Sequence, residues 1–299
     1  MQRLQFQHAG FTLVEMIMVM VITGIIASMV AVFIRVPVDA YLDTARRAEL
    51  TDEADASLRF IARELKAALP NSIRCDSTGT PRYIEFIPVN SGGRYREHPT
   101  SAGAGTPLEF GVNTTSFDLI GKGQANSAST QTAHASATAG TVVVGNLSKD
   151  PSNACSAYVG DNASALSSID GVTGAVTIAP KNIPNGCNLE TAAVVDDTGT
   201  ANNEENDRGA GRFFVVGGPV LYACGPGGLL RYAGYSASSG PGVSAPSGSP
   251  AILAGRVSAC DLACDGVNAR IQTISFRITV TSGGESLQLF RQVRVENLP

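Results

Sequence analysis

The sequence predicts an α+β fold, with one long N-terminal α-helix packed against an antiparallel β-sheet domain that carries long loops. Three observations predict it. A single apolar run lies near the N-terminus, and a charged segment with helical periodicity follows it. The rest of the chain alternates short β-type runs with stretches rich in Gly and Ser. We therefore divide the chain into residues 1–10, 11–34, 35–70 and 71–299.

The apolar run, residues 11–34, is long enough to cross a membrane as a helix. At ~1.5 Å per residue it spans roughly 36 Å, against a hydrocarbon core of about 30 Å. Its interior contains Gly24, Ala27 and Ser28, small residues that permit close approach between helices. The preceding segment carries Arg3 and no acidic residue. We therefore expect residues 1–10 to stay in the cytoplasm and the bulk of the chain to lie outside.

Residues 35–70 predict an amphipathic continuation of this helix. Pro37 can kink it, and Pro70 is expected to end it after Leu69. Apolar residues recur at helical spacing, at Leu58, Ile61, Leu65 and Ala68. We interpret the charged residues on the other faces as a solvated surface, with contacts to neighbouring molecules as the alternative. The apolar stripe needs a partner, and a sheet from the remaining chain is the expected one.

Residues 71–299 predict an antiparallel β domain. Strand-like runs lie at 82–89, 117–120, 141–144, 175–178, 212–216, 220–223, 229–233, 271–281 and 286–297. Gly-rich turns at 225–228 and 282–285 predict two hairpins. Apolar and polar residues alternate in the last two runs, so we expect that sheet to have one face in contact with water.

Long loops are expected between these runs. Four stretches, 91–106, 121–140, 198–211 and 235–250, are rich in small and polar residues and are expected to face outward, where adhesion takes place. An acidic, Asn-rich segment at 196–207 offers the oxygen ligands that Ca²⁺ prefers. It lacks EF-hand spacing, so a solvated loop is the preferred interpretation and a calcium site the alternative.

Six cysteines follow the apolar run: Cys75, Cys155, Cys187, Cys224, Cys260 and Cys264. An even number indicates disulfides formed in an oxidising compartment outside the cytoplasm. Six cysteines allow 15 pairings. One interpretation joins Cys155 to Cys187, Cys260 to Cys264, and Cys75 to Cys224. No CxxC motif is present and no His has ligand spacing to a Cys, so we expect no metal site.

Composition and motifs argue against two further classes of function. The net charge is -4, and the basic residues are spread among acidic ones, so we expect no nucleic-acid partner. The sequence contains no GxSxG, HExxH or P-loop pattern, and His98 and His134 lie in the low-complexity stretches. We therefore expect no enzyme activity, no catalytic residue and no cofactor.

The hexapeptide Gly10-Phe11-Thr12-Leu13-Val14-Glu15 opens the apolar run. Gly10 lacks the Cβ that would crowd a peptidase, which makes it a plausible cleavage residue. A secretory signal peptide would carry an AxA-like site after its apolar region, and none stands there. A short leader, a Gly–Phe pair and a glutamate soon after it together resemble the prepilin signature of type IV pilins and type II secretion pseudopilins.

This resemblance implies a pilin-like fold, cleavage after Gly10 and N-methylation of Phe11 by a dedicated prepilin peptidase. It implies as partners other major and minor pilins, an inner-membrane assembly platform, and membrane lipid before assembly. The location it implies is a single-pass inner-membrane protein, with a cytoplasmic N-terminus and a periplasmic domain, that later enters an extracellular pilus.

Glu15 is the one charged residue of the apolar run. A carboxylate in hydrocarbon costs about 2.5–3.5 kcal/mol on insertion scales. The amine that cleavage creates at Phe11 of a neighbouring subunit can pair with this carboxylate and fix the axial register. The alternative is a plain membrane anchor in which Glu15 reaches the headgroups.

Segments outside the motif, at 68–74, 221–232 and 290–299, resemble minor pilin-like proteins of the mannose-sensitive haemagglutinin (MSHA) pilus. The chain is also longer than a typical major pilin. The resemblance implies a minor structural subunit that initiates or caps the filament, at its tip. Two alternatives share these features: the J-type minor pseudopilin of type II secretion, and a minor pilin of a twitching pilus.

Overall fold

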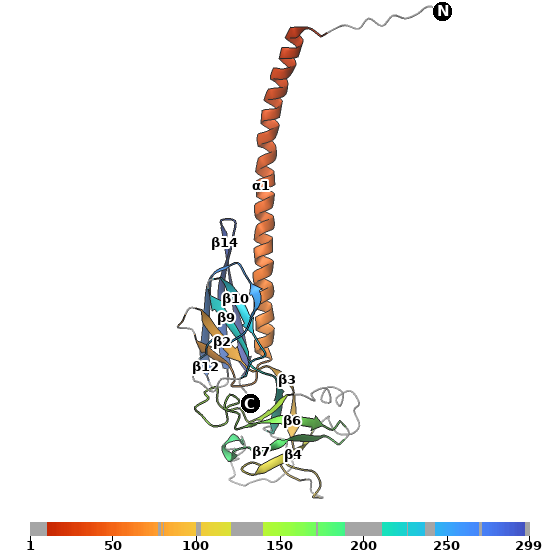
Figure 1. Cartoon of the computed structure of the whole chain (residues 1–299), viewed down its shortest axis with the longest axis vertical. Helices are drawn as coiled ribbons and strands as arrows, with labels where there is room; N and C mark the ends of the chain where they lie inside the picture. The colour runs from red at the N-terminus through yellow and green to blue at the C-terminus, as the bar shows by residue number, and fades with distance from the viewer. Residues whose placement is uncertain are drawn as a thin grey trace, which may run out of the picture. The chain divides into compact units, whose positions relative to one another are not determined.

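The protein has the α+β architecture that the sequence predicts: one long N-terminal apolar helix precedes a mostly antiparallel β domain (Figure 1). The structure is a computed structural model. It describes residues 11–76, 79, 81–99, 103–120, 140–171, 173–188, 211–225, 227–236, 243–268 and 271–296. The chain forms two compact units, Met1–Thr51 and Asp52–Pro299.

Helix α1 (Leu13–Lys66) contains 54 residues and includes Pro37. A proline removes one backbone donor from a helix, so a long helix can continue through it with a single bond lost. The helix ends earlier than the expected Leu69. The N–H groups of Ala67 and Ala68 donate to carbonyls three residues back, and the Leu69 N–H donates to the Ile87 carbonyl at 2.7 Å. Pairing with the β domain therefore replaces the last helical turn.

Two open sheets lie in the β domain. The first has the order β1 (Arg74–Asp76), β2 (Arg82–Phe86), β9 (Val220–Gly225), β10 (Gly228–Tyr232) and β11 (Ala251–Ala254). The second has the order β12 (Val257–Asn268), β13 (Ile271–Ser282) and β14 (Glu285–Glu296). Both expected hairpins are present, because β9 pairs with β10 and β13 pairs with β14, each antiparallel.

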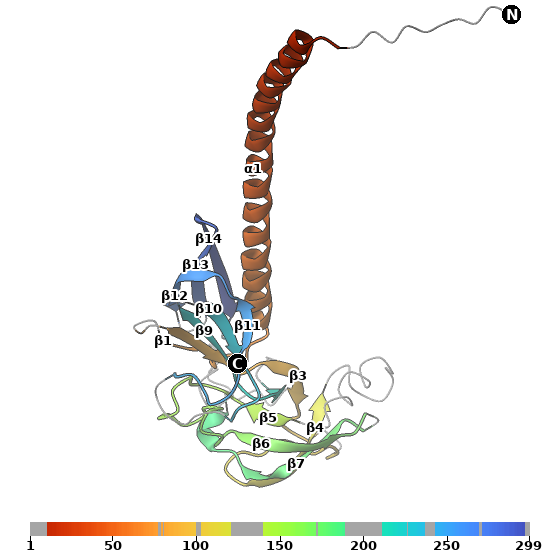
Figure 2. The same ribbon diagram turned by 45° about the horizontal axis from the view of Figure 1, so that its top comes forward.

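A closed barrel forms the third part of the β domain, and the sequence pattern does not predict it. Its strands follow the order β3 (Val89–Tyr95), β4 (Asn113–Ile120), β7 (Ala175–Asn182), β6 (Ala163–Ile169), β5 (Thr141–Val144) and β8 (Arg212–Val216). Figure 2 shows these strands as a group distinct from the two sheets. The strands before and after the barrel, β2 and β9, pair directly through Phe86 and Val220. The barrel is therefore an insertion into the five-stranded sheet.

The barrel has its own hydrophobic core. Tyr95, Phe117 and Phe213 are almost fully buried in it, and the Phe117 and Phe213 rings meet edge to face at 5.2 Å between centroids. A separate apolar set, Leu58, Ile61 and Leu65, is buried along α1. This set is the apolar stripe that the helical spacing predicts. Burial of the stripe stabilises the packing of the C-terminal part of α1 on the sheets.

Every predicted strand run contains a strand, but β1, β3, β6, β11 and β12 were missed. The expectation of a loop throughout 91–106 is wrong, because β3 extends to Tyr95. Its glycines serve close packing. A Cβ added to Gly92 would lie 2.8 Å from the Phe213 carbonyl oxygen, and one added to Gly93 would lie 2.5 Å from Leu119 Cδ2. Glycine occurs inside this strand because a side chain at either position would collide with the neighbouring strand.

All six cysteines are joined in disulfides: Cys75–Cys264, Cys155–Cys187 and Cys224–Cys260. The Cys155–Cys187 interpretation is confirmed. The pairings Cys260–Cys264 and Cys75–Cys224 are wrong, because Cys260 and Cys264 lie in one extended strand, β12. Each of them bonds instead to the five-stranded sheet, to β9 and β1 respectively. These two disulfides therefore join the two open sheets.

Candidate functional site

Phe11 and Glu15 lie at the start of α1 and both are exposed. Phe11 is 83% exposed, and all residues from 11 to 35 are classed as exposed. Gly10, the expected cleavage residue, lies outside the described residues. Among the described residues, Phe11 and Glu15 are therefore accessible to other molecules.

Thr12 caps the N-terminus of α1. The Glu15 backbone N–H donates to Thr12 Oγ1 at 3.3 Å. The order Thr12-Leu13-Val14-Glu15 has the sequence pattern of a capping box, in which Ser or Thr is followed by Glu or Gln at the third helical position. A glutamate in the first turn also interacts favourably with the positive end of the helix dipole. Glu15 therefore has a local structural role, which the sequence analysis missed although the motif is visible there.

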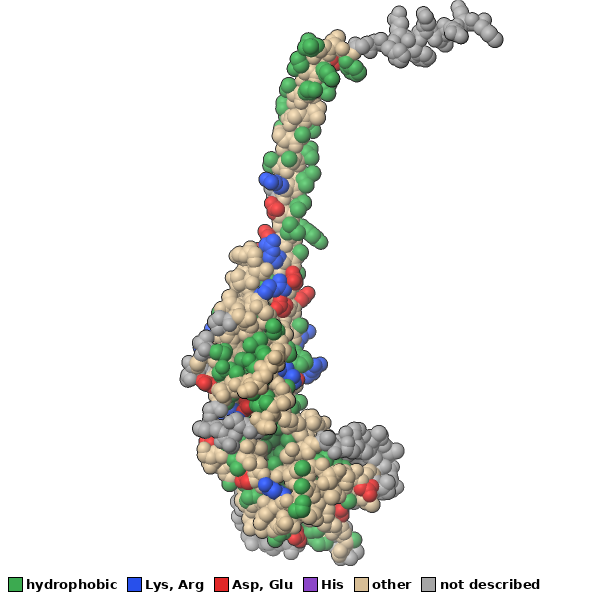
Figure 3. Space-filling model, in the orientation of Figure 1, with side chains coloured by type: hydrophobic (Ala, Val, Ile, Leu, Met, Phe, Trp, Pro, Cys, Tyr) green, Lys and Arg blue, Asp and Glu red, His purple; other side chains and the backbone are tan. Residues whose placement is uncertain are grey.

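The N-terminal part of α1 has no buried side of its own. It is long and apolar enough to cross a membrane, and none of its most apolar window is buried. Hydrophobic side chains gather along this part of the helix in Figure 3. Large apolar side chains such as Met20 and Phe33, 67% and 83% exposed, need an apolar environment of lipid or of other helices.

The C-terminal part of α1 is attached to the β domain by a partly buried polar cluster. Glu64 accepts from Arg231 Nε and Nη2 at 3.1 and 2.9 Å, and Tyr222 Oη also donates to it. Burial, and then the bond to the Glu64 carboxylate, raise the pKa of the Tyr222 hydroxyl. Both partners of Glu64 come from the β9–β10 hairpin. The hairpin thus recognises one carboxylate of the helix.

Two further carboxylates fix the helix to the β11–β12 connection and to β14. Glu53 accepts from Arg256 Nε at 2.9 Å and from the Gly255 N–H at 2.9 Å. Asp55 accepts from Arg291 Nη2, on β14, at 3.1 Å. The sequence predicts that such charges are solvated or face neighbouring molecules. For Glu53, Asp55 and Glu64 both interpretations are wrong, because the sheets of the same chain supply the partners.

Glu53 should make stability depend on pH. Burial opposes its ionisation, but the bonds from Arg256 and Gly255 outweigh this and lower its pKa below the ordinary value of 4.5. A lowered pKa stabilises the fold above the ordinary value, and this stabilisation disappears as pH falls through the folded-state pKa. Glu53→Gln should therefore lower the free energy of unfolding by about 1 kcal/mol at pH 7, with the loss vanishing in acid. Denaturation of the full chain in detergent at several pH values measures this.

Asp52→Asn is the matched control for Glu53→Gln. Asp52 is the adjacent residue and is exposed. Its replacement should change the free energy of unfolding by no more than about 0.5 kcal/mol at any pH. An equal loss in both variants, or a Glu53→Gln loss that persists at low pH, contradicts the assigned role of Glu53.

One group of metal-ligand type appears in the part of the chain that the structure describes. Sulfur and carboxylate atoms of Cys155, Asp161 and Cys187 lie within 4.8 Å of one another. Both sulfurs are bonded in the disulfide, and Asp161 Oδ2 accepts from the Cys155 N–H at 2.8 Å. These atoms are therefore engaged in holding a loop. The acidic segment 196–207, His8 and His134 lie outside the described residues.

The residues that dock the helix were not recognised from sequence. Arg231 and Tyr222 lie in the predicted hairpin. Each is separated from Glu64 by more than half of the chain, so no local pattern connects them to it. A partial signal was available, because Tyr222 and Arg231 are directly opposed in a two-strand hairpin whose turn was recognised. A hairpin of known register predicts which side chains are neighbours, although it does not predict which helix residue meets them.

Comparison with known proteins locates the functional signal in the N-terminal segment. Residues 6–31 match the family model for the prokaryotic N-terminal methylation motif. No curated protein and no solved structure matches the chain. The matched residues include Phe11, Glu15 and most of the exposed apolar part of α1. The chain carries the N-terminal methylation motif of type IV prepilins and pseudopilins on a helix that fits a single-pass inner-membrane anchor, which supports a place in that family.

Proposed function

We propose that this protein is a structural subunit of a pilus-type filament, cleaved after Gly10 and methylated on Phe11. The observation that supports it best is the methylation motif at the start of an exposed apolar helix. In this proposal the helix is first anchored in the inner membrane, with residues 71–299 on the periplasmic side. Assembly then moves it from lipid into contact with the helices of other subunits, without need for enzyme activity or a cofactor.

Glu15 is the proposed assembly residue. It is the single charge between Phe11 and Ile34, and its side chain is exposed. The amine of a cleaved Phe11 on an adjacent subunit supplies the opposite charge. Pairing them removes two uncompensated charges from an apolar environment and sets one axial register.

The filament we propose is an MSHA-type pilus, in which the chain acts as a minor pilin that resembles MshO. The resemblance rests on 68–74, on the Leu221–Tyr232 region and on the C-terminal strand region. A J-type minor pseudopilin of type II secretion is the second candidate, since the Arg231-Tyr232 hairpin is common to both. The inserted barrel adds bulk to the globular part, which supports placement at the filament tip, where no subunit lies above it.

Mass spectrometry of the mature N-terminus tests the processing step. Protein purified from cells with a prepilin peptidase should begin at Phe11 and carry one additional methyl group. Gly10→Val, which adds a branched side chain at the cleaved bond, should leave Met1 in place, whereas Gly24→Val lies beyond the bond and should be processed normally. An intact N-terminus in the unmodified chain, or cleavage beyond Ile34, contradicts the proposal.

A further inference from the structure

The barrel is connected to the rest of the chain by a narrow neck. One link is Ile87–Pro88, between β2 and β3, and the other is Gly217–Gly218–Pro219, between β8 and β9. The two links start side by side, because Phe86 pairs with Val220. The Gly217 N–H donates to the Pro88 carbonyl at 3.3 Å. Adjacent glycines accept a wide range of backbone angles, so this neck is suited to be a hinge.

A second connection joins the barrel to the turn that follows α1, through side-chain hydrogen bonds. Asn146 Nδ2 donates to the Pro70 carbonyl at 2.7 Å, and Asn71 Nδ2 donates to the Asn146 carbonyl at 2.9 Å. Tyr158 Oη donates to the Ser72 carbonyl at 2.7 Å. Asn146 and Tyr158 both belong to the barrel segment between β5 and β6, and they are 2% and 4% exposed. We call these two residues the clamp.

The clamp is itself supported on both sides. On the barrel side, the Ala157 N–H donates to Asn146 Oδ1 at 2.8 Å, which fixes the orientation of that amide. On the sheet side, the Arg74 guanidinium lies 3.7 Å from the centre of the Tyr158 ring. Arg74 is in turn held by Glu85, to which its Nε donates at 2.8 Å. A buried polar network of this kind fixes one geometry, because breaking it leaves unpaired groups away from water.

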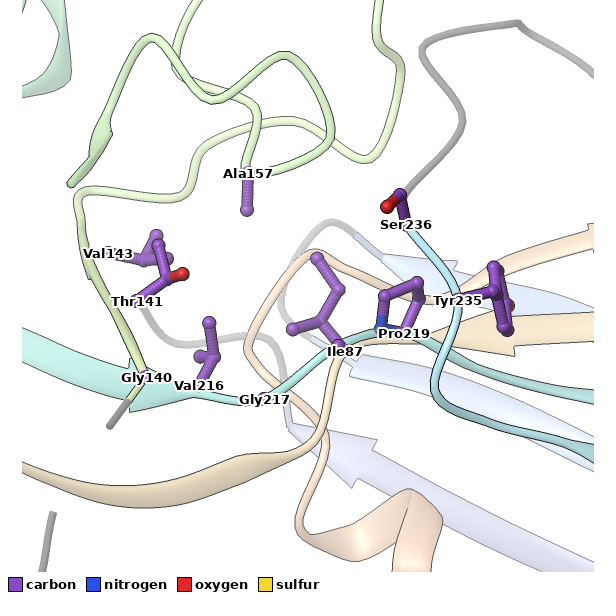
Figure 4. Close-up of a pocket in the computed structure, with 11 residues that line it drawn as sticks. Ile87, Gly140, Thr141, Val143, Ala157, Val216, Gly217, Pro219, Tyr235 and Ser236 are labelled. Carbon is purple, nitrogen blue, oxygen red and sulfur yellow. The ribbon is translucent and has the colours of Figure 1, made fainter. Parts of the chain in front are cut away.

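A hollow borders the neck among the described residues. It has a volume of about 400 Å³ and is lined from the barrel by Val143, Ala157 and Val216 and from the sheet side by Ile87, Pro219 and Tyr235 (Figure 4). Ala157, which lines the hollow, directly precedes Tyr158 of the clamp. The barrel is therefore held against the helix end by the clamp, by the Val89 N–H bond to the Ala67 carbonyl at 2.9 Å and by an apolar cluster that includes Leu69. Among the described residues, it borders a hollow beside the neck.

We propose that the barrel pivots on this neck and that Asn146 and Tyr158 hold it in one orientation. The inference concerns the barrel alone and does not depend on which filament the chain enters. In this arrangement, pulling on α1 acts on the barrel through the turn at Pro70–Ser72 as well as through the neck. Release of the clamp lets the barrel move into the hollow while its own core stays intact.

The test compares distances in the full chain in detergent micelles. Spin labels carried on non-natural amino acids at Lys66 and Val112, both exposed, report the separation between the helix and the barrel without disturbing the disulfides. The unmodified clamp should give a narrow distance distribution. Asn146→Ala with Tyr158→Phe should broaden the distribution and shift its mean. Asn153→Ala, an exposed asparagine of the same segment, should leave it unchanged.

Two further variants separate pivoting from unfolding. Ala157→Phe places a ring in the hollow, so adding it to the clamp variant should narrow the distribution again. Tyr158→Phe alone keeps the ring on Arg74 and removes one bond, so it provides a smaller shift if the double variant does not fold. Amide exchange in β4 and β8 reports whether the barrel core persists. A distribution equal to that of the unmodified chain in any clamp variant that keeps this protection overturns the proposal.

Discussion

Replacement of Glu15 by Gln should strongly reduce entry of the chain into filaments while leaving the protein folded and processed. Gln can replace Glu in the capping box with Thr12, so the helix start is retained and only the charge is lost. The Phe11 amine of the adjacent subunit then has no counter-charge in an apolar environment. A penalty of about 2.5 kcal/mol corresponds to roughly a 60-fold weaker assembly equilibrium. Quantification of the chain in sheared filaments, relative to the membrane fraction, measures the effect.

Three matched variants distinguish loss of the Glu15 charge from loss of another carboxylate and from loss of the helix cap. Glu15→Asp keeps the charge and should retain most of the assembly. Asp39→Asn removes a carboxylate from α1 outside the apolar run and should enter filaments normally. Thr12→Ala weakens the cap and should cost about 1 kcal/mol of helix stability without removing the charge. If Glu15→Gln enters filaments as well as Asp39→Asn does, charge pairing is not what selects the register.

Removal of the disulfides between the sheets should have the second large effect. Cys75→Ser with Cys264→Ser opens a link between residues 189 apart in sequence, and Cys224→Ser with Cys260→Ser opens one between residues 36 apart. Loss of a native disulfide costs roughly 2–5 kcal/mol, with the longer loop expected to lose more. Without them the packing of β12–β14 on the five-stranded sheet should loosen, because no strand ladder joins the two sheets among the described strands and the Gly227 N–H to the Val257 carbonyl, at 3.0 Å, is a single backbone bond between them. Denaturant unfolding and amide exchange of β13 report this.

The third disulfide is the internal control. Cys155→Ser with Cys187→Ser removes a link within the barrel, so it should reduce exchange protection there and leave β13 protected. The same comparison under reducing conditions should reproduce the sum of the variants. Unchanged protection of β13 in a chain without both inter-sheet disulfides contradicts their proposed role. In that case the buried apolar face of β13 and the ion pairs of α1 with Arg256 and Arg291 would be sufficient to hold the sheets together.

The sequence alone determined the features that depend on neighbouring residues. The apolar run from Phe11 to Ile34, the buried stripe at Leu58, Ile61 and Leu65, and both Gly-turn hairpins follow from periodicity and turn chemistry, and the structure contains them. The methylation motif is also local, and the comparison with known families finds it in residues 6–31. Each of these signals is complete within a few turns of helix or two adjacent strands.

Tertiary structure decided which distant segments meet. The barrel could not be anticipated, because its closure pairs β3 with β8 across more than a hundred residues, and Gly92 and Gly93 resemble a loop until their close contacts are known. The disulfides of β12 and the partners of Glu64 depend on the same long-range arrangement. Local patterns specify the type of each element. Which segments pair depends on the packing of the whole chain. A given strand or charged side chain could pair equally well with many segments of the sequence, and only the complete fold brings one of them into contact.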